Sequence, residues 1–162
     1  MKDKNDVADA EEMKEYSIAG VREDWSPPQS FPDLTAYSRI AIDLETRDPN
    51  LMRLGPGWCR DDGYVIGYAV AAGDFIGYYP VRHEGGGNFP ESKVVNWLKK
   101  QMATPKIEKV MHNAMYDLGW MRWAGIEVQG PIIDTMIAAP LLNENRRYYN
   151  LNSLAGEYLG KY

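Results

Sequence analysis

The chain has 162 residues, of which 44% are apolar, and its formal net charge is −5. This length and apolar content allow one domain with a substantial core. The single cysteine, Cys59, excludes an intramolecular disulfide framework and a cysteine zinc cluster, so a reducing, cytoplasmic setting is expected. The acidic balance provides no obvious basic stripe of the kind that an extended duplex-binding surface needs.

Residues 1–36 are expected to form a tail and linker. Residues 1–16 are dominated by Lys, Asp and Glu, which predicts a frayed segment without the apolar core of a signal peptide. Residues 25–34 are rich in proline and are expected to lie extended along a surface. The most apolar stretch, residues 131–142, is interrupted by an aspartate and a proline, so no membrane contact is expected. The compact domain is therefore predicted at residues 37–162.

The predicted elements of this domain begin with three strands and then alternate between helix and strand. Hydrophobic patterning predicts strands at residues 39–45, 64–72, 75–81, 109–111 and 132–133. It predicts helices at residues 91–102, 114–123, 135–142 and 151–159, with Asn113 as the N-cap of the second. This order is typical of an α/β fold in which helices flank a mixed sheet and the first strand lies centrally.

Two glycine-rich segments are predicted as loops. Residues 48–63 contain Gly55-Pro56-Gly57, which disfavours a regular element. Residues 83–88, His-Glu-Gly-Gly-Gly-Asn, lack the Lys-Ser/Thr of a phosphate-binding loop and do not open a helix directly. We expect this second segment to be a mobile surface loop beside the substrate channel.

The strongest candidate site residues are Asp43 and Glu45, at the end of the first predicted strand. Side chains alternate along a strand, so an Asp-x-Glu pair places both carboxylates on one face. Asp117, in the second predicted helix, offers a third carboxylate. Acids from separate elements suit hard divalent cations, and two such cations can cleave a phosphodiester by in-line displacement. Taken singly, each motif is better explained by a solvated strand end or by an exposed helical acid.

Other polar and aromatic residues are given structural interpretations. Asp134 is expected to cap the helix that follows it rather than to bind a metal. His112 is expected to make an ordinary hydrogen bond, and Cys59 has no adjacent base that would make it a nucleophile. Packing between helix and sheet is expected for Met115 and Leu118 and for the tryptophans Trp97, Trp120 and Trp123.

In combination the motifs resemble the 3′-5′ proofreading exonuclease domain of family-A DNA polymerases, particularly the phage-type members. This domain belongs to the DEDD superfamily and has an RNase H-like fold. Asp43-Leu44-Glu45-Thr46 is similar to the first exonuclease motif, and His112-Asn113-Ala114-Met115-Tyr116-Asp117 to the second. Agreement extends, in the family's order, to residues 78–83, 134–143 and 151–159. Several linked motifs at consistent spacing are more specific than any single motif.

The resemblance implies two divalent cations, Mg²⁺ or Mn²⁺, with these residues as metal ligands and catalytic groups: Asp43, Glu45 and Asp117. It implies contacts with the nucleotide from Leu44, Thr46, Asn113 and Tyr116. The family usually places an apolar side chain against the last base, as a wedge, shortly after the first motif. The candidates for this wedge are Pro49, Leu51 and Met52. The implied partners are a single-stranded or frayed DNA 3′ end and a polymerase domain in the same or another chain. The implied location is the cytoplasm, which is the host cytoplasm if a phage encodes the chain.

The chain departs from the family in one respect. The family's third motif, with a fourth acid and a Tyr or His, does not occur before Tyr162. We therefore expect an exonuclease domain truncated at its C-terminus. Two alternatives stay open: an RNase D-like 3′-5′ exoribonuclease, or a non-catalytic module that docks a DNA end or a polymerase. The cluster from Asn113 to Asp117 argues against a third, an endonuclease of the RNase H or integrase type.

Overall fold

The computed structural model describes residues 26–84 and 86–160, which divide into two compact units. The larger unit is Pro27–Arg146, and the helix α6 (Leu151–Leu159) belongs to the other. The expected tail at residues 1–16 lies outside the described residues, and the boundary between residues 36 and 37 stays a prediction. No helix in the described ranges is long and apolar enough to cross a membrane.

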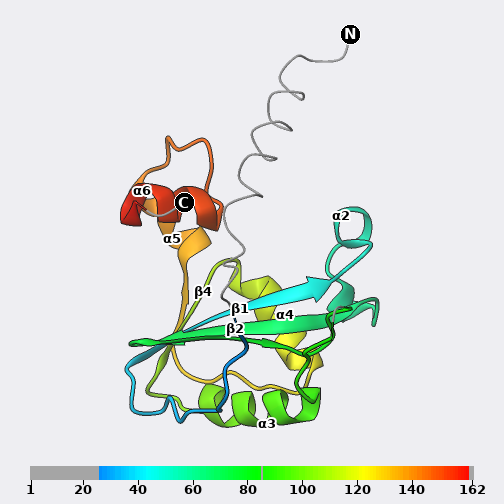
Figure 1. Ribbon diagram of the computed structural model, residues 1–162. Coiled ribbons are helices and arrows are strands. Elements are labelled where there is room, and N and C mark those ends of the chain that lie inside the picture. The colour runs from blue at the N-terminus through cyan, green and yellow to red at the C-terminus, as the bar shows by residue number, and fades with distance from the viewer. Residues whose placement is uncertain (1–25, 85, 161–162) are drawn as a thin grey trace. The chain divides into compact units, whose positions relative to one another are not determined.

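Five strands of the larger unit form one mixed sheet in the order β3-β2-β1-β4-β5 (Figure 1). The strands are β1 (Arg39–Arg47), β2 (Tyr64–Ala72), β3 (Phe75–Pro80), β4 (Glu108–Met111) and β5 (Ile132–Asp134). Strand β2 pairs antiparallel with both β1 and β3, whereas β4 pairs parallel with both β1 and β5. The predicted mixed sheet with a central first strand is therefore confirmed.

The helices of the larger unit are α2 (Leu51–Leu54), the short 3-10 helix η1 (Gly57–Cys59), α3 (Glu91–Met102), α4 (Ala114–Trp123) and α5 (Thr135–Leu142). The predicted bounds of α3, α4, α5 and α6 agree with the structure. The prediction missed α2 and η1, because helices of four and three residues are too short to show an apolar period.

One face of β1 packs into the core through Ile40, Ile42 and Leu44, which are all buried. The same core cluster contains buried side chains of α3 and α4, among them Leu98 and Trp120, and Figure 1 shows α3 along one face of the sheet. The intervening β1 residues, which include Asp43 and Glu45, lie on the opposite face because strand side chains alternate.

Two details of packing differ from expectation. The described part of the proline-rich segment, residues 26–34, does not lie wholly on a surface, because Leu34 at its end is buried in the core and its backbone N–H donates to the Gln101 side chain. Met115 was predicted to face the core, but it is 67% exposed. The buried positions of α4 are Ala114, Asp117, Trp120 and Met121. In this helix the acid Asp117 is therefore buried and the apolar Met115 is exposed. A prediction from residue type alone gives the opposite arrangement.

Candidate active site

Asp43 and Glu45 lie near the C-terminal end of β1, on either side of the buried Leu44. The pairing of β1 with β2 is irregular between Glu45 and Thr46, since Glu45 lies opposite Gly67 while Thr46 lies opposite Val65. A bulge of this kind re-aims the side chains beside it. The predicted placement of both acids on one strand face is confirmed, and the bulge begins immediately after them.

Asp117 lies in the first turn of α4 and is only 3% exposed. The alternative interpretation of Asp117 as an exposed helical acid is therefore wrong. Burial raises the pKa of its carboxyl group to about 8, and repulsion from Asp43 and Asp134 adds to the rise. A hydrogen bond from the Leu44 backbone N–H acts in the opposite direction. The third candidate acid is therefore buried within electrostatic range of the first.

The two strand acids also have raised pKa values. For Asp43, burial raises the pKa, while the electrostatic interaction with His112 and the hydrogen bond from the Leu44 N–H oppose the rise. For Glu45, burial is again the largest cause, and repulsion from Asp43 adds to it. Asp43 thus disfavours the ionised form of both of its neighbours. Asp43 and Glu45 are at exposed positions of β1 and so are only partly desolvated, whereas Asp117 is buried; mutually repelling carboxylates of this kind are stabilised when a cation joins them.

Asp134, at the end of β5, has the opposite character. Its carboxylate accepts hydrogen bonds from the backbone N–H groups of Asn113 at 3.0 Å, Ala114 at 2.8 Å and Met136 at 2.9 Å. Burial acts to raise its pKa, but these backbone donors outweigh burial and the pKa is lowered. The predicted capping of α5 is confirmed, and Asp134 also caps α4, which the sequence did not indicate.

Asn113 was predicted as the N-cap of α4, and the structure confirms this position but not a side-chain capping bond. It occupies the N-cap position in the left-handed conformation, with φ of +70°, and makes no side-chain capping bond. Asparagine tolerates this conformation better than most residues. Because Asp134 caps the helix instead, the Asn113 amide is not committed to the helix terminus.

Tyr116 joins β1 to the loop that follows it. Its hydroxyl lies 2.8 Å from the Thr46 hydroxyl and donates to Asp48 at 3.1 Å. The same Asp48 oxygen accepts the Gly57 backbone N–H at 2.7 Å. A Cβ at Gly57 would lie 1.9 Å from the Asp62 carbonyl oxygen, so only glycine fits this close approach. The sequence offered Gly55-Pro56-Gly57 as a signal of a tight loop, but not Asp48 as its anchor.

His112 makes the ordinary hydrogen bond that was expected. Its Nδ1 lies 2.9 Å from the Thr135 hydroxyl, and that hydroxyl donates to the Met111 carbonyl at 3.1 Å. Because the hydroxyl proton is directed at a carbonyl, Nδ1–H must be the donor in the first bond. This pair connects the end of β4 to the start of α5, directly before the second motif.

The candidates for the apolar wedge lie in the loop after β1. Pro49, Leu51 and Met52 lie at or beside α2, and Met52 is 98% exposed.

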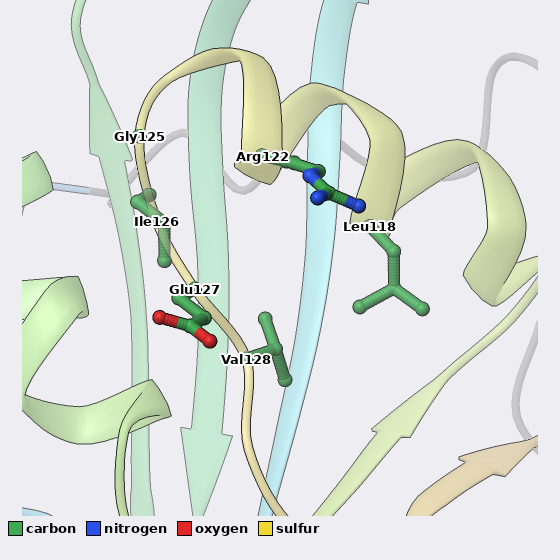
Figure 2. A pocket seen from close by; sticks show the side chains of 6 residues that line it. All are labelled: Leu118, Arg122, Gly125, Ile126, Glu127 and Val128. Atoms are coloured by element: carbon green, nitrogen blue, oxygen red, sulfur yellow. The ribbon is translucent and has the colours of Figure 1, made fainter.

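A pocket of about 580 Å³ is lined by residues of α4 and of the segment after it. Figure 2 shows these lining residues, which are Leu118, Arg122, Gly125, Ile126, Glu127 and Val128. None of the candidate catalytic acids lines this pocket. Within residues 26–84 and 86–160, no three acidic, histidine or cysteine side chains lie close enough to form a metal-ligand cluster.

Comparisons with known proteins show the family to which the chain belongs. A family model described as 3′-5′ exonuclease matches residues 29–162. The DNA-directed DNA polymerase of Pseudomonas phage M6 is 38% identical over 141 residues, covering 83% of this chain and 21% of that protein. The chain spans between 9% and 21% of the length of the curated relatives it matches.

Solved structures share the fold. Brucella melitensis NrnC with bound Mg²⁺ aligns with a TM-score of 0.57 at 18% identity, over 83% of this chain and 59% of that one. Escherichia coli RNase D, an exoribonuclease involved in structured RNA processing, aligns with a TM-score of 0.54 at 22% identity, over 77% of this chain and 28% of that one. The polymerase relative is the more similar in sequence. The chain therefore belongs to the 3′-5′ exonuclease domain family of family-A DNA polymerases and has an RNase H-like fold.

Proposed function

We propose that this chain removes nucleotides from DNA 3′ ends, as the proofreading part of a family-A DNA polymerase. The observation that supports the proposal is the burial of Asp117 of α4 within the electrostatic field of Asp43, which shares a face of β1 with Glu45. The proposed substrate is a single-stranded or frayed 3′ end, because a terminal nucleotide must leave the duplex to reach acids at a strand end. The proposed partner is a polymerase domain in the same or another chain.

The carboxylates suit two divalent cations, Mg²⁺ or Mn²⁺, because their oxygens are the ligands that hard cations prefer. Asp43, Glu45 and Asp117 would hold them, and the mutual repulsion of these groups is the property that a cation relieves. When bound, the cations supply charge neutralisation at the phosphate and activation of the attacking water. Mg²⁺ is present in the NrnC structure, which shares the fold.

The chain's own groups have distinct proposed tasks around the scissile bond. Glu45, on the exposed face of β1, accepts a hydrogen bond from the attacking water and orients it. The backbone at Leu44 and the side chain of Thr46 face the terminal nucleotide, and the hydroxyl of Thr46 is held by Tyr116. Asn113 steadies the scissile nucleotide with the side-chain amide that does not cap α4. Tyr116 is fixed for the same task by its bond to Asp48.

The test is digestion of a 5′-labelled single-stranded DNA, and of an RNA of the same sequence, with Mn²⁺ present. We expect a ladder of products shortened from the DNA 3′ end, lost in Asp43→Ala and retained in Asp74→Asn. Asp74 is a matched control because it lies in the exposed turn between β2 and β3. Cleavage that survives Asp43→Ala would refute the assignment. Preferential cleavage of RNA would favour the exoribonuclease alternative, and Mn²⁺ binding without cleavage would favour the docking module.

A further inference from the structure

Gly67 lies directly opposite Glu45 in the pairing of β1 with β2, and it is buried. A Cβ added at Gly67 would lie 2.1 Å from the hydroxyl oxygen of Tyr78 and 2.4 Å from the ring carbon that carries it. The tip of the Tyr78 phenol therefore occupies the space that a side chain at Gly67 would fill. This glycine admits a tyrosine from β3 to the strand position beside the candidate catalytic glutamate.

The strand register limits the distance between this phenol and Glu45. Directly opposed residues of an antiparallel pair have Cβ atoms about 4.5–5.5 Å apart. Because the phenol oxygen lies 2.1 Å from the position of a Gly67 Cβ, the Tyr78 hydroxyl is roughly 3–7 Å from the Cβ of Glu45, a range that the Glu45 carboxylate can reach. The electrostatics agree, because the pKa of Tyr78 is raised to about 12, chiefly by burial and further by Glu45.

His83 fixes the other side of the phenol. Its Nε2 lies 2.5 Å from the Tyr78 hydroxyl oxygen, and the two rings meet edge to face at 79° with centroids 5.7 Å apart. Asn88 fixes the backbone of His83, since it accepts the His83 N–H and donates to the His83 carbonyl, both at 2.8 Å. The segment expected to be a mobile loop therefore has its two ends tied together around a histidine.

We propose that Tyr78 and His83 are positioning residues for Glu45, in which His83 Nε2–H donates to the phenol oxygen and the phenol donates to the Glu45 carboxylate. This inference rests on the proposed exonuclease function. A carboxylate that keeps one oxygen on a fixed donor presents its other oxygen in one direction, toward the attacking water. The sequence places these residues in the stretch 78–83, but their connection to Glu45 follows only from the position of the Tyr78 phenol over Gly67.

The first test separates positioning from substrate binding through kinetics on single-stranded DNA with Mn²⁺. We expect Tyr78→Phe and His83→Gln each to lower kcat by about 10- to 100-fold while KM is unchanged, because misplaced catalytic groups cost rates of this order. The double variant should be no slower than the slower single variant, since the two residues act as a unit.

Gly67→Ala should cause the same loss of kcat, because the added Cβ displaces the Tyr78 ring. Ile76→Thr, at an 84% exposed position of the same strand, is the control that should leave kcat unchanged. Unchanged kcat in both Tyr78→Phe and His83→Gln would overturn the proposal.

The second test needs neither metal nor cleavage. His83 and His112 are the two histidines of the chain, so their imidazole NMR signals can be assigned with His83→Gln. We expect a proton on Nε2 of His83, and a shift of its signals in Glu45→Gln that Asp74→Asn does not cause. The proposed hydrogen bonds from His83 to Tyr78 and from Tyr78 to Glu45 would be contradicted by a neutral His83 with its proton only on Nδ1. Signals that do not respond to Glu45→Gln would contradict them as well. If the unaltered chain cuts no DNA but these NMR results hold, the proposed function fails while the pairing with Glu45 stands.

Discussion

The carboxylates of Asp117 and Asp134 belong to neighbouring elements, yet their surroundings give them opposite properties. Asp134 accepts three backbone N–H groups and has a lowered pKa. Asp117 is buried near Asp43, and its pKa is raised to about 8. A carboxylate whose hydrogen-bond capacity is used by the backbone stabilises the fold. A buried carboxylate beside other acids is costly in the absence of a cation, which marks it as functional.

The largest expected effect concerns activity. Asp117→Asn should lower exonuclease activity by about 10³-fold, because metal-assisted charge stabilisation contributes several kcal/mol to such reactions. At pH 8 and above, the metal-free variant should be at least as stable as the unaltered chain, since the substitution removes a buried carboxylate that is ionised there. The rate of product release from labelled DNA measures the loss of activity, and thermal unfolding in EDTA measures the stability of the metal-free variant. If Asp117→Asn stays active, or unfolds at a much lower temperature, Asp117 has a structural role rather than a catalytic one.

The second effect is a pH dependence of stability that differs between the two acids. The folded-state pKa of Asp117 is raised, so its contribution to stability is fully present below pH 4 and is lost as pH rises towards about 8. This contribution is on the order of a few kcal/mol. The lowered pKa of Asp134 has the opposite consequence, because its contribution is present above pH 4 and is lost on further acidification.

Urea unfolding of the metal-free chain between pH 5 and pH 8 measures the first of these trends. We expect less stability at pH 8 than at pH 5, with a smaller difference in Asp117→Asn. Saturating Mn²⁺ should reduce the difference as well, because an ion bound to the folded state favours the ionised carboxylate. An identical pH profile in Asp117→Asn would show that this carboxyl group does not titrate as proposed.

Asp134→Ala should lower the free energy of unfolding by about 2–4 kcal/mol, since it removes caps from two helices. Asp134→Asn keeps one acceptor oxygen and should lose less. Denaturant unfolding at pH 7 measures both values. A loss below 0.5 kcal/mol in Asp134→Ala would contradict the capping role.

The smallest expected effect is that of Tyr116→Phe, which removes the hydroxyl between Thr46 and Asp48. A single hydrogen bond of this kind contributes about 1 kcal/mol, so we expect a three- to tenfold loss of activity. The loss should appear mainly in KM, because Tyr116 is proposed to hold the nucleotide. A loss in kcat alone, measured in steady-state kinetics, would place the hydroxyl in the chemical step instead.

The sequence predicted those features that depend on local patterning. Alternation along β1 placed Asp43 and Glu45 on one face, and helical spacing gave α3 its bounds. The double capping by Asp134 was not predictable locally, because it requires β5 to lie beside β4 and direct an acid at a helix 20 residues earlier. The same limit applies to Tyr78, whose position over Gly67 depends on the register of β2 with β3. Exposure of Met115 was missed because residue type was weighed above the phase of α4.

Isothermal titration of Mn²⁺ into the metal-free chain tests the central distinction most directly, with Asp117→Asn and Asp134→Asn titrated alongside. Circular dichroism establishes beforehand that each variant is folded. We expect the unaltered chain and Asp134→Asn to bind Mn²⁺, and Asp117→Asn to lose most of that binding. Undiminished binding in Asp117→Asn, or loss of binding only in Asp134→Asn, would contradict the assignment of Asp117 to the cation site.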